Sequence, residues 1–199
     1  MSQAISYYGV LAIESLFNVF GLRLYEEPRH TVVDRVGSVE IRRYAPRAAA
    51  AVELTPGAVD RNVAFRLLFA YISGANAQSR KVAMTAPVEV RGERVAMTAP
   101  VQTSEQRLVF FLPAEYGVDT APRPADARVR ILAVPAEKIA VLRFAGFGGA
   151  AWTRQRQLLS DLAKSSWKPV GEPFMFYYDA PFTLPFLRRN EAAVVVEQR

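Results

Sequence analysis

The strongest constraint on the fold of this chain is a seven-residue segment that occurs twice. Val82–Val88 has the sequence Val-Ala-Met-Thr-Ala-Pro-Val and recurs letter for letter as Val95–Val101. In both copies larger apolar residues occupy every second position, a pattern typical of a β-strand with one buried face. The repeat therefore predicts two neighbouring β-strands of nearly identical character.

One register of this strand pair brings every apolar side chain against another. Gly92-Glu93 would form a two-residue turn, with glycine at the first central position that a type II′ turn requires. Val90 would then face Val95, and Val88 would face Met97. A shift by one residue would turn the apolar side chains to opposite faces. We therefore expect the two copies to form one β-hairpin.

The composition is that of a folded domain with a basic surface. The chain has 199 residues, of which 51% are apolar and 22% are charged, enough for one sizeable domain or two small ones. Its 25 basic and 19 acidic residues leave a net charge of +6, and the basic residues are scattered rather than gathered in runs. We interpret this charge as a contribution to solubility and a bias toward anionic ligands, and we expect no nucleic-acid partner.

Cysteine is absent from the chain and His30 is its single histidine. Disulfides, thiolate metal sites, cysteine nucleophiles and metal sites with several histidines are therefore excluded. His30 is either a ligand for iron or a solvated side chain near the edge of the domain. Met84 and Met97 could offer thioether sulfur to iron, but their alternating position favours the core.

An apolar segment, residues 4–24, precedes the domain. Glu14 lies in its middle, no basic residue comes before it and no Ala-x-Ala cleavage pattern follows it, which argues against a membrane-spanning helix or a signal peptide. We expect a helical extension over residues 1–25 and a domain over residues 26–199. The extension either packs on the domain or anchors it to a membrane surface, so we expect a cytoplasmic protein that is free or membrane-associated.

The rest of the chain reads as strands and two helices. In addition to the hairpin, the expected strands are 31–36, 39–44, 48–54, 107–112, 128–134, 139–144, 174–178 and 192–196. The expected helices run from Asp60, as N-cap, to about residue 73, and from about residue 150 to 164. The second helix is expected to turn four residues inward: Trp152, Leu158, Leu159 and Leu162. The strands 128–134 and 139–144 are expected to form a second hairpin. The order strand, strand, helix, strands thus occurs twice, which predicts an α+β fold of two related halves in one sheet system.

The first helix carries more apolar surface than one core-facing side needs. Phe65, Leu68 and Phe69 form an apolar face that adjoins the face expected to meet the core. These side chains could form a floor on which a flat apolar ligand stacks. They could equally well pack against the N-terminal extension.

Several stretches of the chain together resemble the SOUL haem-binding protein family. They are Val39–Tyr44, Lys81–Val88, Phe111–Pro113, Phe144–Phe147 and Tyr178–Pro181 through Arg188–Glu191. The resemblance covers about residues 26–198, and its most specific parts are the Met-Thr-Ala-Pro-Val motif and the Arg-Arg-Asn-Glu ending. It implies a distorted antiparallel β-barrel of two pseudo-symmetric halves, each with one long helix, to which this chain adds an N-terminal helix. It also implies non-covalent binding of haem or another tetrapyrrole, by a carrier or sequestration protein without demonstrated catalysis.

The resemblance carries few binding residues onto this chain. Some family members have a histidine, proposed as a haem ligand, where this chain has Arg43. In other members haem lies in an apolar groove beside the first long helix, and two groove positions match Phe65 and Phe69. The apolar platform is therefore expected here, with Leu68 beside it.

The basic residues that lie near the haem carboxylates in those members are not retained. Their positions match Asn62 and Ala70, and a lysine of a late loop falls near Thr183. Arg66, on the same helix, could take over this pairing. The expected ligand-binding residues are Asn62, Phe65, Arg66, Leu68, Phe69, Arg43 and Thr183, with His30 as the candidate metal ligand.

Two other functions are left open by the sequence. The chain could be a membrane-surface or protein-interaction module whose groove is covered by the N-terminal helix. An enzyme would need a buried acid with a perturbed pKa, such as Glu40, Glu53 or Glu191, and because no catalytic motif is present we expect no enzymatic activity. Arg188 and Arg189 are expected to be structural, paired with an acid such as Glu191.

Overall fold

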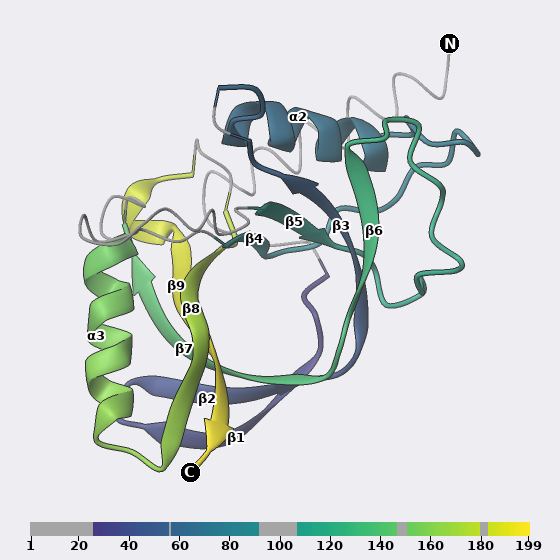
Figure 1. Cartoon of the computed structure of the whole chain (residues 1–199). Helices are drawn as coiled ribbons and strands as arrows, with labels where there is room; N and C mark the ends of the chain where they lie inside the picture. The colour runs from purple at the N-terminus through teal and green to yellow at the C-terminus, as the bar shows by residue number, and fades with distance from the viewer. Residues whose placement is uncertain (1–25, 56, 92–106, 147–150, 180–182) are drawn as a thin grey trace.

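The computed structural model describes residues 26–55, 57–91, 107–146, 151–179 and 183–199, and these form one curved, nine-stranded antiparallel sheet with two α-helices on its outer face (Figure 1). The strands are β1 (His30–Val36), β2 (Val39–Tyr44), β3 (Arg47–Glu53), β4 (Val88–Arg91), β5 (Arg107–Phe111), β6 (Val129–Val134), β7 (Glu137–Ala145), β8 (Trp167–Tyr177) and β9 (Arg189–Gln198). The helices are α2 (Arg61–Ile72) and α3 (Ala151–Ala163), with a short 3₁₀ helix, η2 (Pro185–Leu187), before β9. The expectation of an α+β fold is confirmed.

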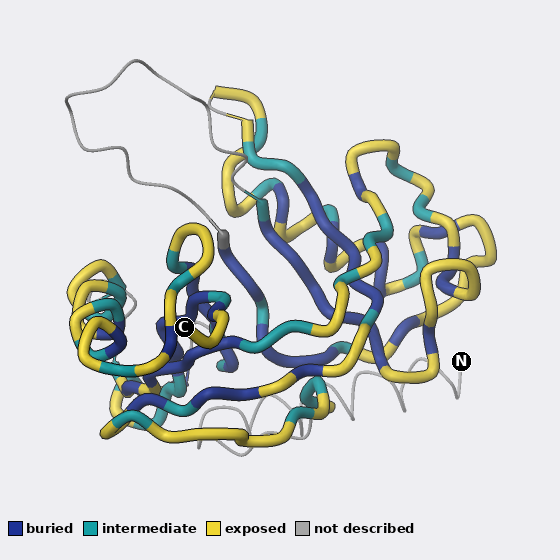
Figure 2. The backbone as a smooth tube through the Cα atoms, turned by 60° about the horizontal axis from the view of Figure 1, so that its bottom comes forward, coloured by how far each residue is buried: buried dark blue, intermediate teal, exposed yellow. Residues whose placement is uncertain are grey.

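The sheet curls strongly but does not close. Its strand order is β1-β2-β7-β9-β8-β4-β5-β3-β6, and the two end strands, β1 and β6, pair with no further strand among the described residues. The distorted antiparallel β-barrel that the family resemblance implied is therefore not confirmed, because the sheet stays open within the described residues. The outward position of β1 is consistent with this, because residues 31–35 of that strand are exposed throughout (Figure 2).

The two halves of the sheet share one order of connection. In β3-α2-β4-β5 and in β7-α3-β8-β9, the last strand lies between the other two, and β4 pairs with β8 to join the halves. Each unit also pairs with the strand that precedes the other unit in the chain. The first strand of the first unit, β3, pairs with β6, and the first strand of the second unit, β7, pairs with β2. A pseudo-symmetric relation of the halves in space stays a prediction.

The prediction that the two copies of the repeat form a hairpin is wrong for the first copy, Val82–Val88. The second copy, Val95–Val101, lies outside the described residues. β4 begins only at Val88, after Pro87, which has no N–H to donate to a sheet. Both edges of β4 are occupied, because Val88 pairs with Phe110 of β5 and with Tyr177 of β8. No edge is left at Val88 or Val90 for the partners that the hairpin required.

The second expected hairpin has the correct strands but the wrong pairing. β6 and β7 are separated only by Pro135-Ala136, yet β6 pairs with β3 and β7 pairs with β2 and β9. Figure 1 shows the chain passing from β6 into β7 as one long sweep across the molecule. This short connection therefore links the two halves instead of folding back on itself.

Helix α2 begins and ends where the sequence predicted. The carboxylate Oδ1 of Asp60 accepts a hydrogen bond of 2.7 Å from the backbone N–H of Val63, which is an N-cap contact. Gly74, with φ of 113°, takes a backbone conformation that other residues rarely adopt and ends the helix. The side chains of Leu68 and Tyr71 are buried on the face that packs against β3, β5 and β6.

The predicted span of helix α3 is confirmed, but not all of the residues that were predicted to face inward do so. Leu158 and Leu162 are buried and Leu159 is half-buried. Trp152 is 46% exposed, and the guanidinium of Arg156 lies 3.5 Å from the centre of its ring. The expectation that Trp152 points inward is therefore wrong, because its apolar ring is covered by a cation one turn along the helix instead of by the sheet.

Three apolar clusters hold these elements together. One lies between α2 and the outer face of β3, β4, β5 and β6, and a second lies between α3 and the outer face of β2, β7, β8 and β9. The third fills the inner face of the curved sheet, where strands of both halves meet. Both helices therefore lie outside the sheet, and each has a second face that the sheet does not cover.

The predicted N-terminal helix, residues 1–25, lies outside the described residues. Among the helices of the described ranges, none combines the length and the apolar character needed to cross a membrane.

Candidate functional site

The outer face of α2 carries two aromatic rings that lie parallel. Phe65 and Phe69 are one helical turn apart, their ring centres are 6.2 Å apart and their planes differ by 9°. They are 39% and 44% exposed. The other side of Phe65 meets the ring of Phe110 edge-to-face at 5.4 Å, which fixes it to the core. The structure therefore brings together two parallel, partly exposed aromatic rings, one of which, Phe65, is anchored to the core from below.

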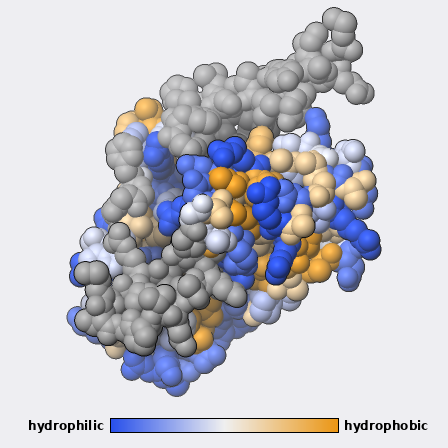
Figure 3. Space-filling model, turned by 45° about the horizontal axis from the view of Figure 1, so that its top comes forward, coloured by the Kyte–Doolittle hydropathy of each residue, from blue (hydrophilic) through white to orange (hydrophobic). Residues whose placement is uncertain are grey.

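Polar and basic side chains surround this aromatic surface. Asn62 and Arg66 are exposed on α2, and so is Arg61, which lies one turn before Phe65. The first turn of α2 contains no acidic residue. Figure 3 looks onto the side of the molecule that carries α2 and shows apolar patches bordered by hydrophilic atoms. Arg61 was missed by the sequence analysis, although its four-residue spacing from Phe65 was a usable signal.

Arg61 also reaches the end of strand β8. Burial raises the pKa of the Tyr177 hydroxyl, and the nearby positive charge of Arg61 opposes this increase. The N-terminal end of α2 therefore lies close to the point where the chain leaves β8 toward η2.

Two of the predicted ligand-binding residues, Leu68 and Thr183, are fully buried. Leu68 is fully buried in the cluster beneath α2. It lies on the side of the helix that faces the sheet, which adjoins the side that carries Phe65. Thr183 is also fully buried, and its carbonyl oxygen accepts a hydrogen bond of 2.7 Å from Nε of Arg188. Neither side chain contributes to the surface around Phe65.

Two further predicted residues lie on a different part of the sheet. Arg43 is exposed on β2, where its register partners are Thr31 and Lys138. His30 begins β1, its ring centre is 5.1 Å from that of Tyr44, and its Nδ1 lies 3.3 Å from the carbonyl oxygen of Pro28. Figure 1 places β1 and β2 at the opposite end of the molecule from α2, so the structure does not bring either residue to the aromatic surface.

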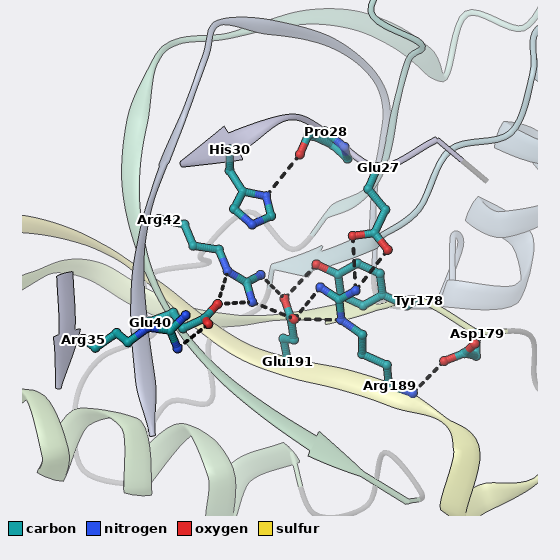
Figure 4. A network of polar contacts seen from close by, with 10 residues as sticks. All are labelled: Glu27, Pro28, His30, Arg35, Glu40, Arg42, Tyr178, Asp179, Arg189 and Glu191. Atoms are coloured by element: carbon teal, nitrogen blue, oxygen red, sulfur yellow. Dashed lines mark hydrogen bonds and ion pairs between the residues drawn. The ribbon is translucent and has the colours of Figure 1, made fainter. Parts of the chain in front are cut away.

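A second concentration of polar groups surrounds Glu191 on the inner face of the sheet (Figure 4). Glu191 is fully buried, and its Oε2 accepts hydrogen bonds from Nη1 of Arg42 at 2.8 Å and from the hydroxyl of Tyr178 at 2.7 Å. Its Oε1 accepts from Nε of Arg189 at 2.9 Å and from Nη2 of Arg42 at 3.2 Å. The expected pairing of Arg189 with Glu191 is confirmed.

The network continues to other parts of the chain. The guanidinium of Arg189 also forms an ion pair of 3.0 Å with Glu27, just before β1, and lies 3.8 Å from the centre of the Tyr178 ring. Arg42 also pairs with Glu40 at 2.8 Å. Ion pairs therefore connect strand β2, strand β9 and the segment before β1.

The electrostatics of this network favour a structural role. Burial alone would lower the pKa of Arg42, but the charge and hydrogen bonds of Glu191 outweigh burial and raise it. Burial and then the charge of Glu191 raise the pKa of Tyr178 well above its usual value. Glu191 already accepts from three side chains, so it has no accessible position from which to exchange a proton with a substrate.

The remaining candidates for metal or acid–base chemistry are also dispersed. Within the described ranges, no group of three or more His, Asp or Glu side chains is placed to hold a metal ion. Met84 is half-buried against the cluster beneath α2, as its alternating position predicted, whereas Met97 lies outside the described residues. Glu53 has one buried carboxylate oxygen, Oε2, without a hydrogen-bond partner in the described part of the chain.

A family model described as SOUL heme-binding protein matches residues 25–195. No curated protein matches the sequence. Among solved structures, the C-terminal domain of EcmrR is similar with a TM-score of 0.55 and 10% identity, covering 81% of this chain and 98% of that domain.

Two other solved structures show the same likeness of fold. An EcmrR–DNA complex has a TM-score of 0.59 at 10% identity, with 81% of this chain and 57% of that chain covered. A hydrolase from Listeria innocua has a TM-score of 0.52 at 11% identity, with 87% and 93% covered. At such low identity these similarities concern the fold alone.

Proposed function

The chain belongs to the SOUL heme-binding protein family, and from this premise we propose that it binds haem or another tetrapyrrole on the outer face of α2. Binding is non-covalent, and the protein acts as a carrier or sequestration protein without catalysis of its own. The observation that carries this proposal is the parallel pair of exposed rings, Phe65 and Phe69. When a flat apolar ligand covers large aromatic side chains and removes them from water, the free energy of the complex is lowered.

The polar border of this surface suits the carboxylates of a tetrapyrrole. Arg61 and Arg66 are exposed on either side of Phe65 along the helix, and guanidinium groups pair with carboxylates through two parallel hydrogen bonds. Asn62 adds a neutral donor beside them. These three residues would orient the ligand, and the phenylalanines would supply most of its contact area.

The macrocycle, not its central metal, is what the protein recognises in this proposal. His30 begins β1, where it lies against Tyr44 and the carbonyl of Pro28, and no contact joins it to Phe65 or Phe69 among the described residues. Bound haem would bring its own iron, and the residues on α2 that surround Phe65 hold the ligand by stacking and charge. His30→Ala is therefore expected to leave haem affinity unchanged.

Titration of the full chain with haemin, followed by the Soret band, tests the proposal. We expect a saturable change at micromolar protein, and affinity at least about 10-fold weaker for Phe65→Asp and Phe69→Asp, since a charge in the stacking surface must be desolvated. Trp152→Asp on α3 is the matched control, because Trp152 is a similarly exposed helical aromatic residue. Absence of saturation, or equal losses in all three variants, would count against binding at α2.

The alternative is a membrane-surface or protein-interaction module in which the N-terminal extension covers the same rings. The partly exposed state of Phe65 and Phe69 favours neither proposal by itself. Deletion of residues 1–25 separates them. If haem binds only after the deletion, the extension competes with the ligand; if the full chain floats with anionic liposomes and the shortened chain does not, the extension is an anchor.

A further inference from the structure

A small cavity lies at one end of the curved sheet, apart from the aromatic surface of α2. Its volume is about 150 Å³. Four segments line it: the residues before β1 (Glu26, Pro28, Arg29), the β2–β3 corner (Ala45, Pro46, Arg47, Ala48), Thr85, and the residues after β5 (Leu112, Pro113, Ala114, Tyr116). This volume is too small for a tetrapyrrole, because pockets for drug-sized ligands begin at about 300 Å³.

The walls of this cavity are rigid and mainly apolar. Three prolines, Pro28, Pro46 and Pro113, contribute to them, and each has a fixed φ. The segment before β1 is tied to the opposite wall, since the carbonyl oxygen of Glu26 accepts from the backbone N–H of Ala86 at 3.0 Å. The carboxylate of Glu26 accepts from the backbone N–H of Ala114 at 3.2 Å. The cavity is therefore held in shape by contacts between its own walls.

Of the two arginines among the described residues that line the cavity, Arg47 is the more buried. Its side chain is 9% exposed, and the central carbon of its guanidinium lies 4.7 Å from the centre of the Tyr44 ring and 4.5 Å from that of Phe111. Contact with two aromatic rings restricts the orientations that the guanidinium can take. Its position is therefore largely fixed before any ligand arrives.

Within the described ranges, hydrogen bonds occupy only two of the N–H donors of the Arg47 guanidinium. Of the five N–H groups of a guanidinium, one donates to Glu137 at 2.7 Å and one to the carbonyl oxygen of Ala45 at 3.5 Å. Nε is buried and has no hydrogen-bond partner in the described part of the chain. A buried cation with unmatched donors attracts an acceptor, and an anionic acceptor most strongly. Arg29, exposed at the rim, adds a second positive charge.

From these observations we propose that this cavity binds a small monocarboxylate with a compact apolar body. The carboxylate lies toward Arg47 and Arg29, and the apolar body lies against the prolines and Leu112. An apolar cavity of about this size is known to hold a benzene-sized molecule, so the body has roughly six carbon atoms or fewer. This site goes beyond the proposed tetrapyrrole function and is independent of it.

Nuclear magnetic resonance titration of the full chain with sodium benzoate tests the proposal. We expect saturable shifts of the backbone amides of Arg47, Ala48, Thr85, Leu112 and Ala114, with a Kd of roughly 1 mM, as about nine non-hydrogen atoms allow. Benzamide, which has the same shape and no charge, is expected to bind at least about 10-fold more weakly. No saturable shift at these amides, or equal binding of benzamide and benzoate, would overturn the proposal.

Three variants assign the binding to this cavity. Ala114→Leu fills it from an exposed position without touching the guanidinium and is expected to abolish the benzoate shifts; Arg47→Met is expected to weaken binding at least about 10-fold. Arg43→Met removes an exposed arginine of β2 and is expected to change nothing. Benzoate shifts that survive Ala114→Leu would place binding elsewhere and overturn the assignment.

Phe65→Asp is expected to leave benzoate affinity unchanged, so failure of the haem experiment and failure of this one are distinguishable.

Discussion

At the scale of single residues, Glu191 is the buried carboxylate on which the network of the inner face converges. It is fully buried and accepts hydrogen bonds from Arg42, Tyr178 and Arg189. A neutral side chain at this position would leave two guanidinium groups without their shared counter-charge. Removing one member of the network therefore lowers the free energy of unfolding, even if the complete network is no more stabilising than apolar residues in the same place would be.

We expect Glu191→Gln to lower the free energy of unfolding by about 3–5 kcal/mol, measured by urea denaturation. Glu197→Gln is the control, because Glu197 is exposed on the same strand, and it should change the free energy by less than about 0.5 kcal/mol. Equal effects of the two variants would show that the buried network does not behave as an ion cluster.

Glu40 predicts a dependence of stability on pH. Burial would raise the pKa of its carboxyl group, but the hydrogen bond and charge of Arg42, and then the charge of Arg35, outweigh burial and lower it. A carboxyl group whose pKa is lower in the folded state stabilises the fold above its unfolded pKa, and this contribution is lost as the pH falls through the folded value. The free energy of unfolding should therefore decrease from about pH 5 to pH 3, and less steeply in Glu40→Gln. A variant with an unchanged slope over this range would contradict the account.

At the scale of elements, periodicity identified the two helices but not which apolar residues face inward. On α3, Leu158 and Leu162 are buried as expected, whereas Trp152, on a neighbouring part of the helix, is exposed beneath Arg156. On α2, Leu68 is buried although it was grouped with the exposed Phe65 and Phe69. Adjacent faces of a helix differ by small rotations, and the packing of the sheet decides between them.

This difference within α3 predicts two unlike substitutions. Leu158→Ala should lower the free energy of unfolding by about 2–5 kcal/mol, because it opens a cavity in the cluster beneath the helix. Trp152→Ala should cost less than about 1 kcal/mol, mainly the lost contact with Arg156. Thermal or urea unfolding of both variants measures this, and a larger cost at Trp152 would mean that its ring is buried in solution.

Strand pairing was the least predictable property of the elements. The repeat around Met84 has good strand periodicity, yet β4 begins after Pro87 and lies between β5 and β8. Partners close in sequence cost less entropy to bring together, which is why a hairpin was the natural expectation. Here β5 and β8 supply apolar partners on both sides, such as Phe110 and Tyr177, and contacts distant in sequence prevail.

At the scale of the whole molecule, the sheet encloses its own core and displays the candidate site on the outside. The inner face is filled by apolar side chains and by the Glu191 network, so it offers little room for a large ligand. Helix α2 instead packs one side on the sheet and leaves the rings of Phe65 and Phe69 partly exposed on the other. A large flat ligand is therefore expected on the outer surface.

The parts of this site that the sequence predicted are those that depend on local spacing. Asn62, Phe65, Arg66 and Phe69 share one side of a helix whose limits were read correctly. The placement of Arg43, Thr183 and His30 depends on which strands and loops lie next to α2, and the strand order that determines this is set by long-range pairing.

The central claim, that a tetrapyrrole lies on the outer face of α2, is tested most directly by line broadening in nuclear magnetic resonance. Paramagnetic ferric haem broadens the amide signals of nearby residues, so added haemin maps its own position on the full chain. We expect the strongest broadening along residues 61–72, centred on Phe65 and Phe69, with β1 and β2 unaffected. Broadening centred on His30 and β1, with α2 unchanged, would contradict it.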